Sequence, residues 1–274
     1  MWRSTLCLAV VAGLCSAAGP VKIVLVAGRP SHPPGQHEFN AGSMLIEKCL
    51  RQNDGVETVL VKGGWPQDES VFDGASAIVL YMDGGARHPM ILENRLETLG
   101  RYMKKGVGLA CLHYAVEVPK EQGGPELLEW IGGFYERPYS QNPHNDVAVK
   151  QASPSHPISR GWKSFEGRDE WYYKIRFRVE DKRWAPILTT LLPKNEPRLE
   201  TIAWAVERGD GGRGFGFTGG HFHSNWGIED QRRMVVNAIL WTAKREIPRG
   251  GARCEITPAD LTQNLDDKKP PVKK

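Results

Sequence analysis

The sequence predicts an α/β protein with a mostly parallel sheet covered by helices on both faces. Short apolar runs bounded by glycine alternate with segments of helical spacing over the first half of the 274-residue chain. Such runs are typical of strands buried on both faces, and their alternation with helices is typical of βαβ units. The clearest run spans 106–115 and reads Gly-Val-Gly-Leu-Ala-Cys-Leu-His-Tyr-Ala, so that its strand ends at His113. A parallel sheet displays the residues at the carboxyl ends of its strands to one crevice.

The elements of the first half follow from this pattern. Strands are expected at 21–27, 56–61 and 75–82, and in the run that ends at His113. Helices are expected at 40–52 and 89–104, where apolar residues recur at steps of three and four. The Pro- and Gly-rich stretch that follows the first strand is a loop.

From about Trp130 the chain becomes richer in aromatic residues and proline. The strands expected there are 147–150, 171–179, 187–192, 201–207 and 214–218. A last helix over 229–245 carries apolar residues that pack back on the sheet. We interpret this half as further sheet with long inserted loops and not as a second domain.

The two ends of the chain are expected to lie outside the domain. Residues 1–18 have a positive start at Arg3, an apolar core and a small-residue cleavage site, which together indicate a signal peptide. We therefore expect a protein exported to the periplasm or the extracellular space, with no membrane span. Residues 19–247 form the α/β domain, and 248–274 form a partly disordered C-terminal tail.

Composition and missing motifs exclude several classes of function. The balance of 36 basic against 32 acidic residues predicts no nucleic-acid partner. The three cysteines after the leader, Cys49, Cys111 and Cys254, are too few and odd in number for a disulfide framework. Cys111 lies two residues inside its strand, where a nucleophile is poorly placed. The chain has no G-x-S-x-G elbow, no P-loop, and no G-x-G-x-x-G after the first strand.

Polar residues follow several of the predicted strands. His37 stands at the entry to the first helix, Asp83 follows the third strand, and His221 and His223 follow the strand at 214–218. If these strands are parallel neighbours, their polar groups converge with His113 on one crevice.

The histidines are candidate metal ligands. His221 and His223 offer two imidazoles to one ion if the backbone between them is extended, and His37 and His113 complete a set of four for zinc or a similar divalent metal. The alternative is a loop whose histidines hydrogen-bond to the backbone or to a substrate.

The segment Asp169-Glu-Trp-Tyr-Tyr173 is the second dense group of polar and aromatic residues. Adjacent residues of a strand point to opposite faces, so only one of the two carboxylates enters a given pocket, and we favour Glu170. A carboxylate beside an imidazole orients it or acts as a general base. The aromatic residues form either a platform for a sugar ring or part of the core. The candidate substrate-binding residues are Asp83, Tyr114, Asp169, Trp171 and Trp226.

With these motifs in view, the chain resembles the trehalose-utilisation (ThuA-like) family from about Val21 to Arg245. The resemblance rests on ordered segments, which are His37, 106–115, 156–161, 169–173, 202–204 and 212–221. It implies a flavodoxin-like, class I glutamine amidotransferase-like fold in which His113 holds the place of the amidotransferase cysteine. It also implies a role in processing disaccharides or keto-sugars, in a pathway shared with sugar oxidoreductases.

These observations predict an exported carbohydrate-active enzyme, a hydrolase, lyase or isomerase that acts on a disaccharide, keto-sugar or keto-glycoside. His113, Glu170 and His221 are the expected catalytic residues, working by acid–base chemistry with the assistance of a divalent metal. The alternatives are a non-catalytic carbohydrate-binding or accessory protein on the same scaffold, and a cysteine hydrolase using Cys111.

Overall fold

The computed structural model of the protein describes residues 19–178 and 180–269. The predicted signal peptide at 1–18 and the last five residues of the predicted tail lie outside the described residues. Within the described part, none of the helices combines the length and the apolar character needed to cross a membrane.

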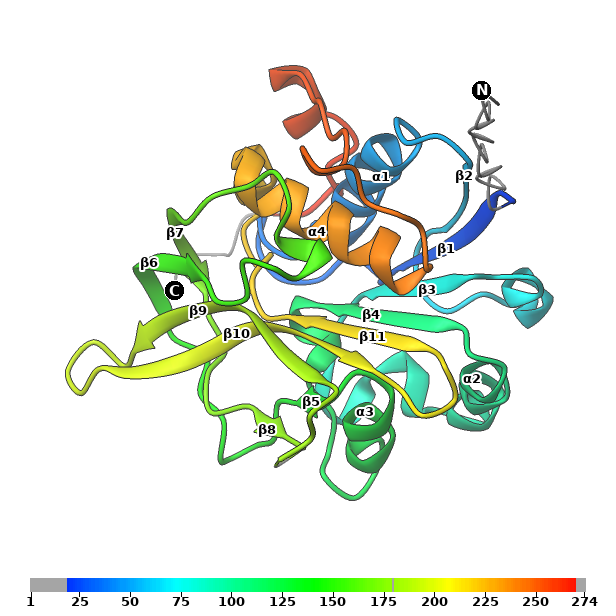
Figure 1. The fold of residues 1–274 in the computed structure, drawn as a ribbon, viewed down its shortest axis with the longest axis horizontal. Helices are drawn as coiled ribbons and strands as arrows, with labels where there is room; N and C mark the ends of the chain where they lie inside the picture. The colour runs from blue at the N-terminus through cyan, green and yellow to red at the C-terminus, as the bar shows by residue number, and fades with distance from the viewer. Residues whose placement is uncertain (1–18, 179, 270–274) are drawn as a thin grey trace, which may run out of the picture.

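One nine-stranded sheet runs through the molecule in the order β2-β1-β3-β4-β11-β10-β9-β6-β7 (Figure 1). Its first five strands are mutually parallel, which is the strand order of a flavodoxin-like sheet. These strands are β1 (Val21–Ala27), β2 (Val56–Val61), β3 (Ala77–Tyr81), β4 (Gly108–Leu112) and β11 (Arg213–Phe217). The predicted fold class, an α/β protein with a doubly wound and mostly parallel sheet, is confirmed.

An antiparallel extension continues the sheet beyond β11. Its strands are β10 (Arg198–Glu207), β9 (Trp184–Leu192), β6 (His144–Gln151) and β7 (Phe165–Glu170). The pair β6–β7 brings His144 opposite Glu170 in register. A separate two-stranded sheet pairs β5 (Gly133–Phe134) with β8 (Arg176–Phe177).

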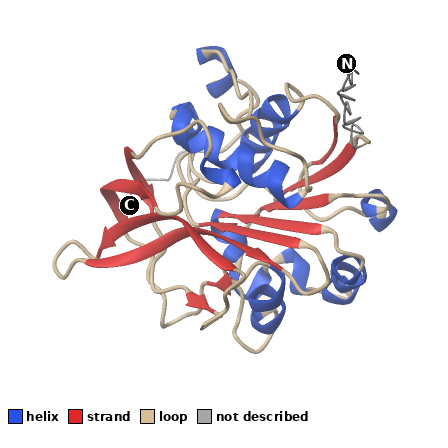
Figure 2. Cartoon of the chain, in the orientation of Figure 1, coloured by secondary structure: helices blue, strands red, loops and turns tan. Residues whose placement is uncertain are grey.

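Helices cover both faces of the parallel half (Figures 1 and 2). One face carries α1 (Phe39–Leu50) and α4 (Glu229–Thr242), and the other carries α2 (Arg95–Lys104) and α3 (Gly124–Trp130). Alternate residues of β1 enter different cores: Ile23 packs in the α1/α4 cluster and Val24 in the α2/α3 cluster. A strand buried on both sides in this way needs a continuous apolar run, and this run is the feature from which β1 was predicted.

Two predicted elements differ from the structure. The expected helix over 89–104 is a short 3₁₀ turn at Pro89–Ile91 followed by α2 from Arg95. The expected strand over 171–179 is wrong in position, because β7 ends at Glu170 and only Arg176–Phe177 returns to strand. The aromatic residues in between are buried as core side chains, so their composition reflects packing and not strand pairing. The short helix α3 was not predicted, because Gly123, Gly124 and Pro125 obscure its start.

The C-terminal segment is packed against the domain up to Lys268, which corrects its interpretation as a tail. Ala252 and Cys254 are buried in the α1/α4 core, and Arg232 of α4 donates a hydrogen bond to the Cys254 carbonyl oxygen (2.8 Å). A 3₁₀ turn at Pro258–Leu261 follows, with Asp260 buried beside Lys48. This packing was not predicted, because the segment is mostly polar and only a few of its residues contact the domain.

Candidate metal and active site

Four side chains from distant parts of the chain meet at the carboxyl edge of the sheet. One ligand atom from each of His37, His113, Glu170 and His221 lies within 4.8 Å of the other three. His37 Nε2 is 2.9 Å from His221 Nδ1 and 3.1 Å from His113 Nε2, and the last two atoms are 3.3 Å apart. Glu170 Oε2 is 3.1 Å from His221 Nδ1 and 3.5 Å from His113 Nε2. We call these four residues the His/Glu centre.

The ends of three strands position the members of the centre. His113 follows β4 directly and His221 follows β11, whereas Glu170 is the last residue of β7. His37 lies between β1 and α1, and its backbone N–H donates to the His221 carbonyl oxygen (3.0 Å). His37 and His113 have positive φ angles of 46° and 53°. Non-glycine residues rarely adopt this conformation, and such residues are concentrated at functional sites.

Oxygen acceptors fix the orientation of two of the imidazoles. His113 Nδ1 is 2.8 Å from the Thr218 carbonyl oxygen, which can only accept, so Nδ1 carries the proton. His37 Nδ1 likewise lies 3.1 Å from the Asp83 carboxylate. Both rings therefore present the lone pair of Nε2 to the centre. Such partners behind a histidine are what orient metal-binding imidazoles.

These proton assignments leave the centre in need of a cation. The Nε2 lone pairs of His37 and His113 face each other at 3.1 Å and repel unless a positive charge lies between them. An N–H on His221 Nδ1 can donate to only one of these two lone pairs. The other ring nitrogen, His221 Nε2, is buried without a partner among the described residues. A shared proton or a metal ion between the facing lone pairs removes their repulsion. Nitrogens about 2.0–2.1 Å from a tetrahedral zinc ion lie about 3.3 Å apart, close to the spacings observed here.

The ionisation of the centre follows from burial and neighbouring charge. Burial, together with the neighbouring imidazoles, holds the pKa of His37 far below its ordinary value, so its ring is neutral. Burial acts to raise the pKa of Glu170, but the neighbouring imidazoles of His113 and His221 outweigh it and hold that pKa well below the usual range. Three imidazoles around one carboxylate make a donor set suited to a divalent metal.

Further residues support the centre, and the sequence did not point to most of them. Asn142 donates from Nδ2 to Glu170 Oε1 (3.0 Å), and His144 Nε2 lies 3.7 Å from the same oxygen. Tyr172 places its hydroxyl 3.5 Å from His113 Nε2. No spacing rule connects these residues to the strand ends, because they lie in β6 and in the segments just before β6 and just after β7.

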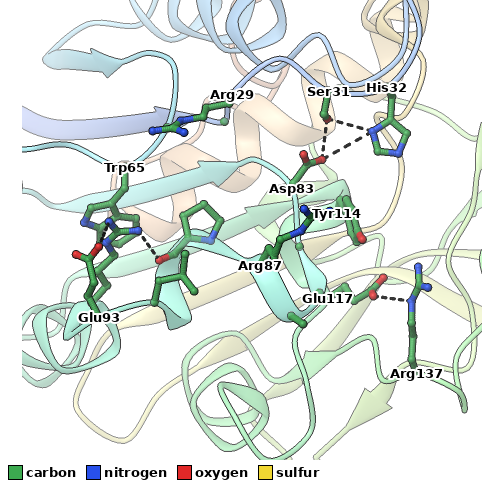
Figure 3. Close-up of a pocket in the computed structure, with 18 residues that line it drawn as sticks. Arg29, Ser31, His32, Trp65, Asp83, Arg87, Glu93, Tyr114, Glu117 and Arg137 are labelled. Atoms are coloured by element: carbon green, nitrogen blue, oxygen red, sulfur yellow. Dashed lines mark hydrogen bonds and ion pairs between the residues drawn. The ribbon is translucent and has the colours of Figure 1, made fainter. Parts of the chain in front are cut away.

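A cavity of about 980 Å³ adjoins the centre (Figure 3). His32, Asp83 and Tyr114 line it, whereas none of the four residues of the centre does. The His32 ring stacks on the His37 ring with centroids 3.6 Å apart, and Asp83 binds His37 from the cavity side. Burial lowers the pKa of His32. The predicted substrate residues Asp83 and Tyr114 thus lie at the cavity wall, and His32 is a cavity residue that the sequence analysis missed.

Four predicted site residues are placed elsewhere, and these assignments are corrected. His223 begins a 3₁₀ turn (His223–Gly227), so it does not share a face with His221, and Glu170 takes its place in the centre. Trp171 and Trp226 are fully buried in the core and cannot contact a substrate. Asp169 is also fully buried, and it accepts hydrogen bonds from the backbone N–H groups of Gly220 (2.7 Å) and His221 (3.0 Å).

Cys111 is buried inside β4, and burial raises the pKa of its thiol. A thiol in that state is protonated and inaccessible, which is the opposite of a catalytic nucleophile. The three cysteines of the described chain are all unpaired and buried.

Comparison with solved structures places this fold among ThuA-like proteins. One from Bacteroides uniformis is 17% identical with a TM-score of 0.63, covering 84% of this chain and 94% of that one. One from Parabacteroides merdae is 16% identical with a TM-score of 0.61, covering 88% and 99%. Agd3, described as a carbohydrate deacetylase, is 13% identical with a TM-score of 0.53; the match covers 83% of this chain and 33% of Agd3.

A comparison with curated proteins found no match. The sequence model of the ThuA family, described as trehalose utilisation, matches residues 24–242. The chain therefore belongs to the ThuA family.

Proposed function

We propose that this protein is an exported carbohydrate-active enzyme that acts on a disaccharide or keto-sugar with a divalent metal ion held by the His/Glu centre. The family assignment and the carbohydrate deacetylase among the proteins of similar fold suggest a carbohydrate-related function. The leader predicted at 1–18 supports export. The chemistry rests on the residues of the centre and of the cavity beside it.

The observation that carries the proposal is the arrangement of the ring nitrogens. Three imidazole nitrogens lie 2.9–3.3 Å from one another, and a carboxylate oxygen lies 3.1 Å from one of them. The two acceptors behind His37 and His113 turn lone pairs, not N–H groups, toward the centre. A purely structural histidine cluster gains nothing from that orientation, because facing lone pairs destabilise it.

Each residue then has a defined task. His37, His113, His221 and Glu170 would hold the metal, while Asp83 and the Thr218 carbonyl keep two of the rings oriented. A divalent metal in such a site polarises a carbonyl group or activates a water molecule.

The cavity wall supplies the groups that meet the substrate. His32 is held by Ser31 Oγ (3.1 Å) through Nδ1, which leaves Nε2 to accept a proton from a bound sugar. Burial raises the pKa of the Tyr114 phenol, so this group stays protonated and can donate a hydrogen bond to a carbonyl or hydroxyl oxygen. Hydrolysis of a keto-glycoside, or proton abstraction beside a keto-sugar carbonyl, fits these groups.

Elemental analysis of the native protein combined with a turnover screen on oxidised and unoxidised disaccharides tests the proposal. We expect about one divalent metal ion per chain and turnover on at least one keto-sugar. His113→Ala removes a ligand and should lower bound metal to background and turnover by about a thousandfold or more. Cys111→Ser, in the strand that precedes His113, is the matched control and should keep both the bound metal and the turnover.

Two results would contradict the proposal that this protein is an enzyme. A protein that binds sugars but contains no metal and turns over none of them is a carbohydrate-binding protein on this scaffold. A His113→Ala variant with unchanged turnover would show that the centre is not the site of chemistry.

A further inference from the structure

We infer that the sugar bound in the cavity beside the His/Glu centre carries an anionic substituent, a carboxylate or a phosphate, which Arg29 and Arg87 recognise. The inference rests on the proposed function and names the substrate class for the same site. The cavity, at about 980 Å³, is large enough for a disaccharide.

The charges of the cavity wall are paired with two exceptions. Four arginines line the cavity, namely Arg29, Arg87, Arg95 and Arg137. Arg95 pairs with Glu93 (3.1 Å) and Arg137 with Glu117 (2.7 Å), and both of these acids also line the cavity. Arg29 and Arg87 make no hydrogen bond or ion pair with any described residue, and Figure 3 shows none between them and the other residues drawn.

Unpaired arginine is unusual in this protein. Among the arginines that the structure describes, all but Arg29, Arg87 and Arg249 have a partner in another residue. Two of these three line the same cavity. If arginines were left unpaired at random, two of the three would not be expected to line the same cavity.

The remaining acid of the wall cannot neutralise these two guanidinium groups. Asp83 is engaged by His37 (3.1 Å) and Ser31 (2.8 Å), and it lies beyond ion-pair distance of both free arginines. Arg29 lies with its stem against the Gly64 backbone, and Arg87 ends the short 3₁₀ turn at Gly85–Arg87. Both residues are exposed and line the cavity, and their donors are engaged by no other described residue. Guanidinium groups bind carboxylate and phosphate oxygens with charge-assisted hydrogen bonds.

The cavity wall also contains a buried carboxylate and an aromatic ring. Glu117 is buried, and its Oε2 atom has no hydrogen-bond partner among the described residues, although Oε1 accepts from Arg137. Because the Oε2 atom has almost no accessible surface, a sugar bound in the cavity does not reach it. Trp65 adds an apolar surface to the same cavity. The aromatic surface of Trp65 and the unpaired guanidinium groups of Arg29 and Arg87 together fit an acidic sugar.

Isothermal titration calorimetry on the full protein tests the inference with matched pairs of sugars. The pairs are trehalose with trehalose 6-phosphate and cellobiose with cellobiouronic acid, each measured at low and high salt. We expect at least one anionic member to bind about tenfold more tightly than its neutral partner, with the advantage reduced at high salt. Which pair shows the preference distinguishes phosphate from carboxylate.

The variants assign the preference to residues. Arg29→Gln and Arg87→Gln should each reduce the anionic preference severalfold and leave binding of the neutral sugar within about twofold. Arg249→Gln is the control, because Arg249 is also exposed and unpaired but lies outside the cavity. It should change neither value.

The remaining outcomes separate this inference from the proposed function. Equal binding of neutral and anionic members, or a preference that survives in both variants, overturns the inference alone. Absence of binding to all four sugars overturns it together with the carbohydrate assignment. Loss of metal or turnover in His113→Ala leaves the charge preference intact, because the preference is measured as binding.

Discussion

The parallel and antiparallel halves of the sheet contribute to the His/Glu centre in different ways. The parallel half supplies its imidazoles from the segments that follow β1, β4 and β11, because parallel strands end at the same edge. The antiparallel extension supplies only Glu170, which ends β7 at the far side of the sheet order. The carboxylate is held beside the imidazoles because Asp169, the preceding residue of β7, accepts hydrogen bonds from the backbone N–H groups of Gly220 and His221. The imidazoles of the parallel half are thus brought together by the common direction of its strands, whereas Glu170 of the antiparallel extension is positioned by particular hydrogen bonds.

The loop that holds His37 is further secured by the C-terminal segment. Lys268 Nζ donates to the carbonyl oxygens of Gln36 (2.6 Å) and His37 (3.1 Å) and pairs with Glu38 (3.2 Å). The Lys268 side chain is 5% exposed and that of Glu38 is 1% exposed. The position of an imidazole in the parallel half therefore depends on residues more than 200 positions away.

Lys268→Met tests this dependence, and its effect should exceed those of Glu170→Gln and His88→Gln. It leaves the Glu38 carboxylate buried without its cation, which should lower the free energy of unfolding by about 3 kcal/mol. Urea denaturation measures the change. Lys269→Met is the control at an exposed neighbouring position and should alter stability by less than about 0.5 kcal/mol. Equal stability of the two lysine variants would show that the segment does not secure the loop.

Glu170→Gln tests the contribution of the antiparallel half. The substitution keeps the shape of the side chain and its contact with Asn142 but removes the negative charge beside His113 and His221. We expect metal affinity to fall about 10- to 100-fold while the protein stays folded. Competition with a chelator measures the affinity, and Glu166→Gln on the same strand, where the side chain is exposed, is the control. If both variants bind metal like the native protein, the centre is formed by the parallel half alone.

His88 offers the smallest and most specific test, through pH. It is fully buried beside the parallel half, where its Nδ1 accepts from the Met90 N–H (3.1 Å) and its Nε2 lies 3.1 Å from the Ala115 carbonyl oxygen. Burial lowers the pKa of His88 to about 4, against the partial opposing effect of the Ala115 hydrogen bond. The unfolded chain takes up this proton near pH 6.5, whereas the folded chain does not. The stability due to neutral His88 is therefore complete above pH 6.5 and is lost as the pH falls toward 4.

Between pH 7 and pH 5.5 this single group should lower the free energy of unfolding by about 1 kcal/mol. His88→Gln removes the titration and should flatten the pH dependence by that amount in urea denaturation. Amide hydrogen exchange should show the acid-induced loss first in β4 and not in β9, because His88 packs next to the segment that follows β4. A variant with the native pH slope would assign the acid sensitivity to other groups.

The sequence predicted the parallel half well and the extension poorly. The strands of the parallel half were located to within a few residues, because strands buried on both faces leave unbroken apolar runs. The same reasoning brought His37, His113 and His221 to one edge. It failed at 171–179, where buried aromatic residues resemble a strand, and at Trp171 and Trp226, where core packing resembles a sugar platform.

The sequence by itself determined which of the buried strands are followed by imidazoles, because a strand buried on both faces leaves a continuous apolar run that locates its end. Only the tertiary structure decided that Glu170 and not His223 completes the set, that His32 and two unpaired arginines border the cavity, and that Lys268 lies beneath His37. These contacts join residues far apart in the chain through turns and long side chains. Such contacts cannot be predicted from the periodicity of the sequence, because they depend on where the folded loops lie relative to one another.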